Sequence, residues 1–438
     1  RDRPHFLPQV QLRLDSVGRQ PRYSFLLMLG PGVLLAATGV GGGDLATASF
    51  VGGLLGTAVL WAVVFGAFLK FVVTEGLTRW QLATGSTFIE GVVARLGPVT
   101  VWLFLPYLLL WSFFVGAAQM SACGVTLHAI FPVFESAETG KVVFGVLSGI
   151  AGLALVWRGG YALFEQLMRV CILLMFASVV TTAIRLWPGT GEVLQGLLIP
   201  RIPAADAQNI TWTVALIGGI GGTLTVLCYG YWLREEGMTR RADLRACRID
   251  LASGYVMTAI FGVAMVIVGS NVVMEGSGTG LLVDLSDRLE QALGPAFKWL
   301  FLIGTWGTVF SSLLGVWQSA PYLFADCWRL RSQRSATATP GGVETQGAAY
   351  RAYLVLLALV PMIGLFYSFR EIQKIYTVTG ALLFPVLAVA LLVFNGRAAW
   401  VGAEFRNGLA SIVTLLVVLA FFGVLAVLVF SGMIGSVS

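Results

Sequence analysis

Two glycine clusters interrupt hydrophobic segments at matching places in the two halves of the 438-residue chain. The first cluster runs from Gly39 to Gly43 and leads into Asp44, and the second runs from Gly218 to Gly222. A membrane helix that is interrupted once in each half is typical of transporters with inverted repeats, where the freed backbone groups face a binding site at mid-membrane. Small residues also let unbroken helices pack closely, but two clusters at equivalent positions favour two broken helices.

The composition predicts an all-α integral membrane protein. The chain is 57% hydrophobic and 11% charged, with a mean hydropathy of +0.84. Apolar stretches long enough to cross a bilayer recur along its length, which excludes a soluble fold. We predict eleven spans, and they cover residues 24–54, 57–79, 99–131, 141–157, 161–186, 210–234, 249–273, 296–327, 350–369, 373–395 and 409–432.

The segments between the spans are expected to be mostly loops. Residues 1–23 form a polar tail, and residues 331–349, rich in Ser, Thr, Gly and Gln, are predicted to be a flexible loop. Residues 187–209 and 274–295 are the other long hydrophilic stretches, and the second of these is expected to hold a short helix over 281–293.

Lysine and arginine predict the orientation. With the N-terminus in the cytoplasm, the tail and the loops after the even-numbered spans hold 19 of the 28 basic residues, and the opposite loops hold 7. The remaining two, Lys70 and Arg169, lie within spans. This bias follows the positive-inside rule. We therefore expect an integral protein of a prokaryotic cell membrane, with a cytoplasmic N-terminus and an extracytoplasmic C-terminus.

The order of the spans predicts an inverted repeat. Five spans in residues 24–186 and five in 210–395 must enter the membrane from opposite sides, because five is odd. Residues 187–209 would connect the two repeats outside the cytoplasm, and residues 396–438 would add a loop and an eleventh span. This is the architecture of LeuT-type transporters.

Three short runs resemble segments of the natural resistance-associated macrophage protein (Nramp) family of divalent-metal transporters. They are Gly30-Pro31-Gly32-Val33-Leu34-Leu35 leading into Leu45-Ala46-Thr47, Arg79-Trp80-Gln81-Leu82-Ala83-Thr84-Gly85, and Gly221-Gly222-Thr223-Leu224. The resemblance implies a LeuT-type fold, a divalent cation as substrate, and a site between the first and sixth helices.

The chain departs from this family where the family binds metal. Its first helix has Asp-Pro-Gly-Asn where this chain has Gly41-Gly42-Gly43-Asp44, so the metal-binding aspartate is replaced by glycine. The Met-Pro-His of its sixth helix falls on Thr225-Val226-Leu227, and a further histidine falls on Trp232. The third span lacks the family's carboxylates over residues 113–119. The chain therefore resembles a divergent branch of the family.

Asp44 is the one carboxylate at either predicted break. An acidic residue inside a membrane is costly, which makes Asp44 a candidate ligand for a cation, including a metal ion. It also follows three glycines at the start of a helical stretch, where aspartate is a favoured cap. The two roles can coexist, because a capping carboxylate can also face a substrate cation.

The other candidate site residues offer backbone carbonyls, hydroxyls, a thiol or a phenol around the two breaks. They are Thr38, Gly39, Gly41, Gly42, Gly43, Thr47, Gly222, Thr223, Thr225, Cys228 and Tyr229. Oxygen-rich surroundings suit hard or hydrated cations better than manganese or iron. Serine and threonine in membrane helices also often bond to their own backbone, and Cys228 can equally be a small buried residue.

The remaining polar residues of the spans are interpreted as structural. Glu75 with Arg79 and Glu165 with Arg169 have the i,i+4 spacing of helix ion pairs. Lys70 lies deeper and is expected to extend toward the membrane surface or to pair with Glu75. The remaining polar side chains considered, which we expect to bridge helices, are Tyr107, Gln119 and Gln318.

The sequence thus predicts a secondary transporter that works by alternating access, with a harder divalent cation such as Mg²⁺ as its substrate. One alternative keeps the fold but moves a small organic solute, and another is a membrane sensor or scaffold that transports nothing. No nucleotide motif, nucleophile–base set or metal cluster indicates an enzyme, and we expect no cofactor. The expected partners are the lipid bilayer and the small ion or solute, with no nucleic acid.

Overall fold

The structure, a computed structural model, describes residues 30–271, 280–331 and 347–435, and all the regular elements in these ranges are helices. The elements are α1 (Pro31–Gly39), α2 (Gly42–Leu55), η3 (Gly56–Val59), α3 (Leu60–Thr84), α4 (Phe88–Leu96), α5 (Val99–Ile130), α6 (Ala137–Arg185), α7 (Thr190–Leu198), α8 (Ala207–Gly219), η4 (Leu224–Cys228), α9 (Tyr229–Glu235), η5 (Arg241–Asp243), α10 (Leu244–Gly269), α11 (Leu281–Leu293), α12 (Pro295–Leu330), α13 (Ala348–Leu359), η6 (Val360–Phe366), α14 (Phe369–Ala381), α15 (Leu383–Phe394), α16 (Ala398–Val401) and α17 (Leu409–Gly435).

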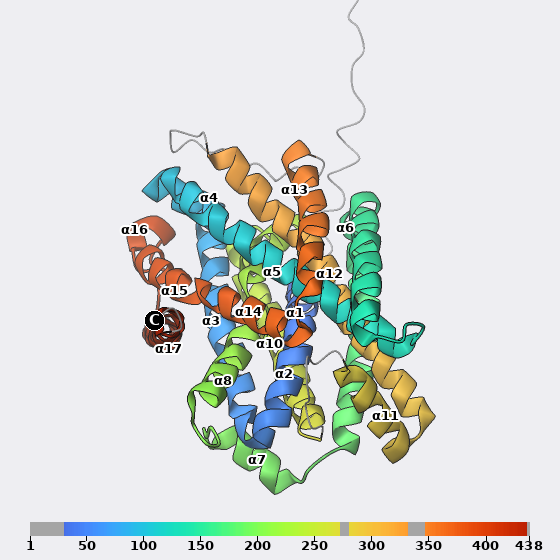
Figure 1. Cartoon of the computed structure of the whole chain (residues 1–438). Helices are drawn as coiled ribbons and strands as arrows, with labels where there is room; N and C mark the ends of the chain where they lie inside the picture. Colours follow the sequence, from blue (N-terminus) through green and yellow to red (C-terminus); the bar gives the residue numbers. More distant parts are fainter. Residues whose placement is uncertain (1–29, 272–279, 332–346, 436–438) are drawn as a thin grey trace, which may run out of the picture.

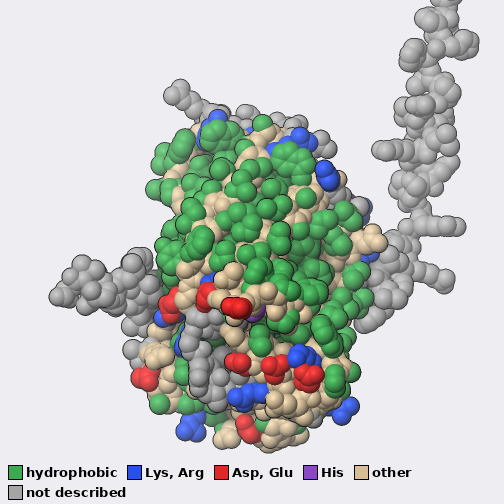
Figure 2. All heavy atoms as spheres, turned by 45° about the vertical axis from the view of Figure 1, so that its right-hand side comes forward, with side chains coloured by type: hydrophobic (Ala, Val, Ile, Leu, Met, Phe, Trp, Pro, Cys, Tyr) green, Lys and Arg blue, Asp and Glu red, His purple; other side chains and the backbone are tan. Residues whose placement is uncertain are grey.

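The predicted all-α membrane fold is confirmed. Within the described ranges, nine helical segments are long and apolar enough to cross a membrane. The first predicted span is divided between α1 and α2, and the eleventh corresponds to α17, so the count of eleven stays a prediction. Large apolar side chains such as Leu103 and Ile363 are well over half exposed. Figure 2 shows a continuous hydrophobic face of this kind, with charged side chains gathered beyond it, as expected of a surface that lipid covers.

The two halves of α6 lie side by side. This element holds two span-length apolar segments, Ala137–Arg158 and Leu163–Arg185. Gly152 in the first lies against Leu313 of α12, and Cys171 in the second lies against Gly307, about two turns away on the same helix. A straight helix would separate Gly152 and Cys171 by about 28 Å. The chain therefore does not run straight through α6, and both segments pack against α12.

The central helices are the broken ones. α1 and α2 follow one another along the middle of the molecule, and α4 and α7 lie at its two opposite ends (Figure 1). α10 packs against α1, α2 and α3, and α12 packs against α5 and α6. This arrangement buries α1 completely, and it buries all of η4.

The loop predictions have different outcomes. The short helix expected over 281–293 is confirmed as α11. Residues 187–209 are not only loop, because they contain α7, whose apolar residues Val193 and Gly196 are buried; Gly196 lies against the Thr57 carbonyl of η3. The N-terminal tail lies outside the described residues, as does nearly all of the predicted flexible loop over 331–349. The division into two repeats remains a prediction.

Candidate substrate site at two broken helices

The first broken helix is interrupted at Val40 and Gly41. The φ and ψ angles are −80° and 86° at Val40 and −136° and −150° at Gly41, so neither residue continues the α-helix. Gly42 and Gly43 already belong to the first turn of α2. The break predicted from the first glycine cluster is confirmed, although it is shorter than the cluster.

The second broken helix is interrupted between Gly219 and Leu224. After the end of α8 the chain resumes as the 3₁₀-helix η4 and then as α9. Gly221 and Gly222 have φ angles of +74° and +85°. L-residues with side chains disfavour this left-handed region, whereas glycine enters it without steric cost. The second predicted break is therefore confirmed, and its sequence explains its conformation.

The two breaks touch through their backbones. A Cβ atom placed on Gly39, the last residue of α1, would lie 2.6 Å from the carbonyl carbon of Gly221 and 2.8 Å from the amide nitrogen of Gly222. Only a residue without a side chain fits at this distance. The glycine clusters thus bring the unpaired backbone groups of both broken helices to one place in the molecule.

Asp44 joins the two breaks and is almost completely buried. One carboxylate oxygen accepts a hydrogen bond from the Gly221 amide, with an N–O distance of 3.0 Å. The other accepts a longer bond of 3.4 Å from the Gly41 amide, as an acidic residue in the first turn does when it reaches back to the residue that caps its helix. Asp44 therefore caps α2 and also contacts the second break, so its capping role is confirmed and its role as a cation ligand stays a prediction.

Lys70 is the second charged residue at the breaks, and its expected partner was wrong. Its side chain is fully buried in α3, and its ammonium donates to the carbonyl oxygens of Gly218, at 2.7 Å, and of Ile220 and Gly222. It does not pair with Glu75. The sequence signal was its depth: a lysine near the middle of a 25-residue apolar helix is too far from the surface to extend to it.

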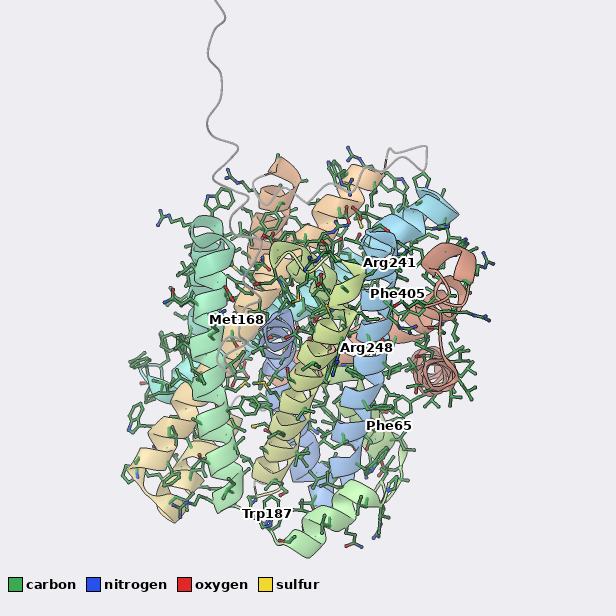
Figure 3. The ribbon with its side chains drawn as sticks, turned by 180° about the vertical axis from the view of Figure 1, so that it is seen from behind. Phe65, Met168, Trp187, Arg241, Arg248 and Phe405 are labelled. Atoms are coloured by element: carbon green, nitrogen blue, oxygen red, sulfur yellow. The ribbon has the colours of Figure 1, made fainter. Side chains whose placement is uncertain are left out.

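Glu75 instead pairs with two arginines near the end of α3 that leads into α4. It pairs with Arg79, as the i,i+4 spacing predicted, with an N–O distance of 2.8 Å. Arg248 of α10 provides a second pair at 2.7 Å. Figure 3 labels Arg248 together with Arg241, whose guanidinium lies over the ring of Phe405. The predicted pair of Glu165 and Arg169 is also present.

Polar side chains of α5 and α12 enclose the breaks. The indole of Trp111 donates to the Thr223 hydroxyl at 2.7 Å. Gln119 donates to the Ser312 hydroxyl at 2.8 Å, and Ser312 donates to the Thr38 carbonyl at 2.6 Å. The expected bridging role of Gln119 is therefore confirmed, and Trp111 and Ser312 are neighbours of the site that the sequence reasoning missed.

Tyr107 and Gln318 bridge helices as expected. Tyr107 donates to the Thr379 carbonyl at 3.2 Å, and Gln318 accepts from the indole of Trp232 at 2.8 Å. Trp232, which stands where the resembling family has a histidine, therefore packs α9 against α12. Through this hydrogen bond the indole nitrogen of Trp232 faces α12 and not the breaks.

Three buried hydroxyls beside the breaks are unsatisfied. Within the described part of the chain, the hydroxyl oxygens of Thr38, Thr47 and Thr225 have no hydrogen-bond partner. Thr47 lies one turn after Asp44, and the Thr225 oxygen lies 2.5 Å from where a Cβ of Gly222 would be. A buried polar group without a partner is destabilising and calls for an explanation. The Thr38 hydroxyl lies against α12, 2.1 Å from where a Cβ of Gly315 would be, which leaves Thr47 and Thr225 as the hydroxyls open to a ligand or water at the breaks.

Two candidate residues lie away from the breaks. The Cys228 thiol points to the Ser319 carbonyl of α12, at 3.7 Å. The Tyr229 hydroxyl donates to the Asp250 carboxylate at 2.8 Å, and that carboxylate accepts from the Gly32 amide at 2.6 Å. Gly32 is at the opposite end of α1 from the break. We therefore assign Cys228 and Tyr229 to helix packing.

The atoms around the breaks that could coordinate a cation are almost all oxygens. They come from backbone carbonyls, from threonine hydroxyls and from the carboxylate of Asp44. No group of three or more His, Cys, Asp or Glu residues that could hold a metal ion occurs among the described residues. Oxygen donors suit hard cations, which also keep part of their water. The arrangement lacks the soft ligands that favour transition metals.

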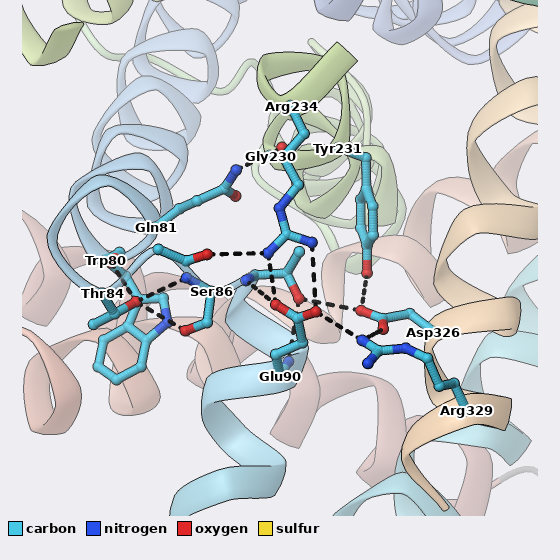
Figure 4. Close-up of polar contacts among 12 residues, drawn as sticks. Trp80, Gln81, Thr84, Ser86, Glu90, Gly230, Tyr231, Arg234, Asp326 and Arg329 are labelled. Atoms are coloured by element: carbon cyan, nitrogen blue, oxygen red, sulfur yellow. Dashed lines mark hydrogen bonds and ion pairs between the residues drawn. The ribbon is translucent and has the colours of Figure 1, made fainter. Parts of the chain in front are cut away.

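A second polar cluster, which the sequence reasoning missed, ties together the α4 end of the molecule (Figure 4). Glu90 of α4 pairs with Arg234 of α9 at 2.6 Å and with Arg329 of α12 at 2.7 Å. Arg329 also pairs with Asp326, which accepts from the Tyr231 hydroxyl at 2.7 Å. These residues are far apart in sequence, so only the tertiary structure brings them together.

Charge within this cluster governs the pKa of Glu90. Burial alone would raise the pKa of the carboxyl, but the hydrogen bond and the positive charge of Arg234, together with Arg329, hold the pKa below its ordinary value of 4.5. Glu90 is therefore ionised at neutral pH, and it connects α4 with both α9 and α12. The cluster holds the α9 part of the second broken helix in place.

Comparisons with known proteins agree with this geometry. A family model described as "Natural resistance-associated macrophage protein-like" matches residues 32–431. A divalent metal cation transporter MntH of Yersinia enterocolitica is 23% identical over 439 residues, which cover 95% of this chain and 98% of that protein. The MntH of Chromohalobacter salexigens is 24% identical over 250 residues, and this match spans only 56% of that protein.

The fold is shared with solved transporters. The crystal structure of the Eremococcus coleocola manganese transporter, in complex with an aromatic bis-isothiourea substituted compound, superposes with a TM-score of 0.70. The match covers 93% of this chain and 87% of that chain at 16% identity. Such low identity establishes the fold alone, and the predicted LeuT-type fold is confirmed.

Proposed function

The chain belongs to the natural resistance-associated macrophage protein-like family, and on this basis we propose that it is a secondary transporter that moves a divalent cation by alternating access. The observation that carries the proposal is the direct contact of two broken helices, with Asp44 bridging them. Relatives over most of the chain are named divalent metal cation transporters, which supports a cation as the substrate.

The cation would bind between the breaks. Asp44 would supply the negative charge, and freed carbonyls together with the hydroxyls of Thr47 and Thr225 would supply neutral oxygens. A divalent ion in such surroundings would keep several of its waters, as magnesium does. Because the thioether and imidazole positions of the family are Thr225 and Leu227 here, we propose Mg²⁺ rather than Mn²⁺ or Fe²⁺.

Alternating access requires one end of the site to open while the other closes. The cluster around Glu90 fastens α9 to α4 and α12 at the α4 end. We propose that this end faces the cytoplasm, because the basic loops predicted to be cytoplasmic meet there. The cluster would then have to break when the substrate leaves toward the cytoplasm.

Uptake into liposomes tests the proposal. The purified protein would be reconstituted around a fluorescent indicator, and the entry of Mg²⁺ and Mn²⁺ would be compared. We expect faster Mg²⁺ entry, which Asp44→Asn abolishes. Asp206→Asn is a matched control, because Asp206 caps α8 by accepting from the Asn209 amide at 2.8 Å, and asparagine can keep this bond. Tight Mn²⁺ binding at the breaks, measured by calorimetry, would contradict the choice of a hard cation.

One observation favours the organic-solute alternative. The charge of Asp44 is already opposed by the ammonium of Lys70, so the breaks carry no net charge for a free cation to neutralise. A panel of ions and small solutes tested for thermal stabilisation separates the candidates. Stabilisation by Mg²⁺ supports the cation transporter, stabilisation by an organic solute supports the alternative, and no stabilisation supports a sensor or scaffold.

A further inference from the structure

Lys70 fills the second break in the way that a bound cation would. An ammonium has three N–H donors and no acceptor, and here it meets three carbonyl oxygens, those of Gly218, Ile220 and Gly222. The end of α8 leaves such carbonyls without helical partners. The ring of Phe384 on α15 covers the ammonium from another side, with its centroid 5.1 Å away.

Asp44 and Lys70 hold the same peptide group from its two ends. The carbonyl of Ile220 accepts from Lys70, and the next amide, that of Gly221, donates to Asp44. The negative carboxylate of Asp44 and the positive ammonium of Lys70 therefore lie at opposite ends of a single peptide unit. Both side chains are buried and have no access to bulk water, so their charges act at close range with little screening.

A purely structural role for Lys70 explains only part of this arrangement. Uncharged donors such as glutamine could also satisfy carbonyls, and because a charge inside a membrane is costly, its presence points to a function. The hydroxyl of Thr74, one turn further along α3, bonds to the Tyr255 phenol of α10 at 2.7 Å. Within the described part of the chain, the ammonium of Lys70 contacts the three carbonyls of the break and the ring of Phe384, and Asp44 holds the same break from the other side.

We infer that the Lys70 ammonium is a tethered cation that occupies the oxygen site of the second break, so that a free cation can use these oxygens only after the ammonium has left them. The inference rests on the proposed function and deepens it. Lys70 would then be a specificity-determining residue, because it weakens cation binding in the resting state. A site that holds its ion less tightly also releases it more easily.

Cation affinity in a variant without the ammonium tests this inference. Lys70→Met removes the charge and keeps most of the volume. Lys141→Met is the matched control, because Lys141 is also fully buried and donates to a carbonyl, that of Tyr367, at 2.7 Å, but lies on α6 and pairs with Glu138. Calorimetry with MgCl₂ on the full-length purified protein would give the affinities.

We expect Lys70→Met to bind Mg²⁺ at least about tenfold more tightly than the unmodified protein, a change of 1.4 kcal/mol. Lys141→Met should bind like the unmodified protein. Equal or weaker affinity in Lys70→Met would overturn the inference while leaving the proposed function intact. Absence of Mg²⁺ and Mn²⁺ binding in every protein, together with absence of uptake, would instead overturn the proposed function and this inference with it.

A second variant, Lys70→Gln, tests the inference if Lys70→Met does not fold. Lys70→Gln keeps donors for two of the three carbonyls and removes the charge. Size-exclusion chromatography and thermal unfolding would establish that it is folded. Tighter Mg²⁺ binding by this variant supports the inference, and unchanged binding overturns it, because a role limited to satisfying carbonyls would leave the affinity unaltered.

Discussion

Replacing Gly39 by alanine probes the contact between the two breaks most directly. The added Cβ would lie 2.6 Å from the Gly221 carbonyl carbon, 2.8 Å from the Gly222 nitrogen and 2.9 Å from the Gly221 oxygen, whereas ordinary contacts begin at 3.4 Å. The backbones must therefore separate by 3.4 − 2.6 = 0.8 Å. No flexible side chain can move aside, because all three atoms belong to the main chain.

The cost of this separation follows from what holds Gly221 and Gly222. Their peptide groups accept from Lys70 and donate to Asp44, so a shift of this size strains both sets of hydrogen bonds. Overpacking a well-packed interior typically costs about 1–3 kcal/mol, and we expect Gly39→Ala to lie at the upper end of this range. Cation uptake should fall with it, because the two halves of the site no longer meet.

Gly191→Ala is the control for this prediction. A Cβ at Gly191, in the first turn of α7, would meet no atom within 4 Å. Alanine in a helix is favoured over glycine by about 1 kcal/mol, so this variant should be as stable as the unmodified protein or slightly more stable. Thermal unfolding in detergent and uptake in liposomes would be measured on both. The reasoning is refuted if Gly39→Ala unfolds at the same temperature as Gly191→Ala and transports equally well.

Two further substitutions test the charges of Asp44 and Glu90. Asp44→Asn should lower the free energy of unfolding by about 1–3 kcal/mol, because it removes the charged acceptor of the Gly41 and Gly221 amides. Asp44 also offsets the buried charge of Lys70 across the break, so the double variant Asp44→Asn with Lys70→Met should unfold at a higher temperature than Asp44→Asn alone; a double variant that is no more stable contradicts this coupling. Because the pKa of Glu90 is held below 4.5, the stability that its ion pairs contribute is complete above that pH and is lost as the pH falls through the lowered pKa. Glu90→Gln should therefore remove this loss of stability at acid pH. It should also loosen α9, and limited proteolysis at neutral pH would detect this as faster cleavage near Arg240. Equal cleavage rates in the two proteins would argue that the cluster does not fasten α9.

Local sequence was sufficient to predict most of the long apolar helices and the places where two of them break, but not the short helix α7. Hydropathy over some twenty residues reports whether a segment can cross a bilayer, and this is a property of the segment itself. The clusters at Gly39–Gly43 and Gly218–Gly222 predicted the breaks. In the second cluster the reason is local, because glycine enters without cost the left-handed conformation found at Gly221 and Gly222. In the first cluster, the close approach of Gly39 to Gly221 leaves no room for a side chain. The i,i+4 pair of Glu75 and Arg79 is local in the same sense.

The partners of the charged residues were decided by tertiary packing. Lys70 bonds to carbonyls that lie 148 to 152 residues further along the chain, and no pattern near Lys70 reports where α8 will lie. The expectation that it would pair with nearby Glu75 failed for this reason. The cluster of Glu90, Arg234 and Arg329 was missed because its members belong to three separate helices.

Helix geometry explains why some candidates at the second break lie elsewhere. Cys228 and Tyr229 are close to Gly222 in sequence. The chain reaches them through η4, which ends at Cys228 and is a 3₁₀-helix with 3.0 residues per turn instead of 3.6. This change of period alters which side chains face the break, and it directs Cys228 toward α12 and Tyr229 toward α10. Sequence by itself determined that the two helices break; only the folded structure, through the winding of the chain after each break and the helices packed around it, decided which side chains surround the gap.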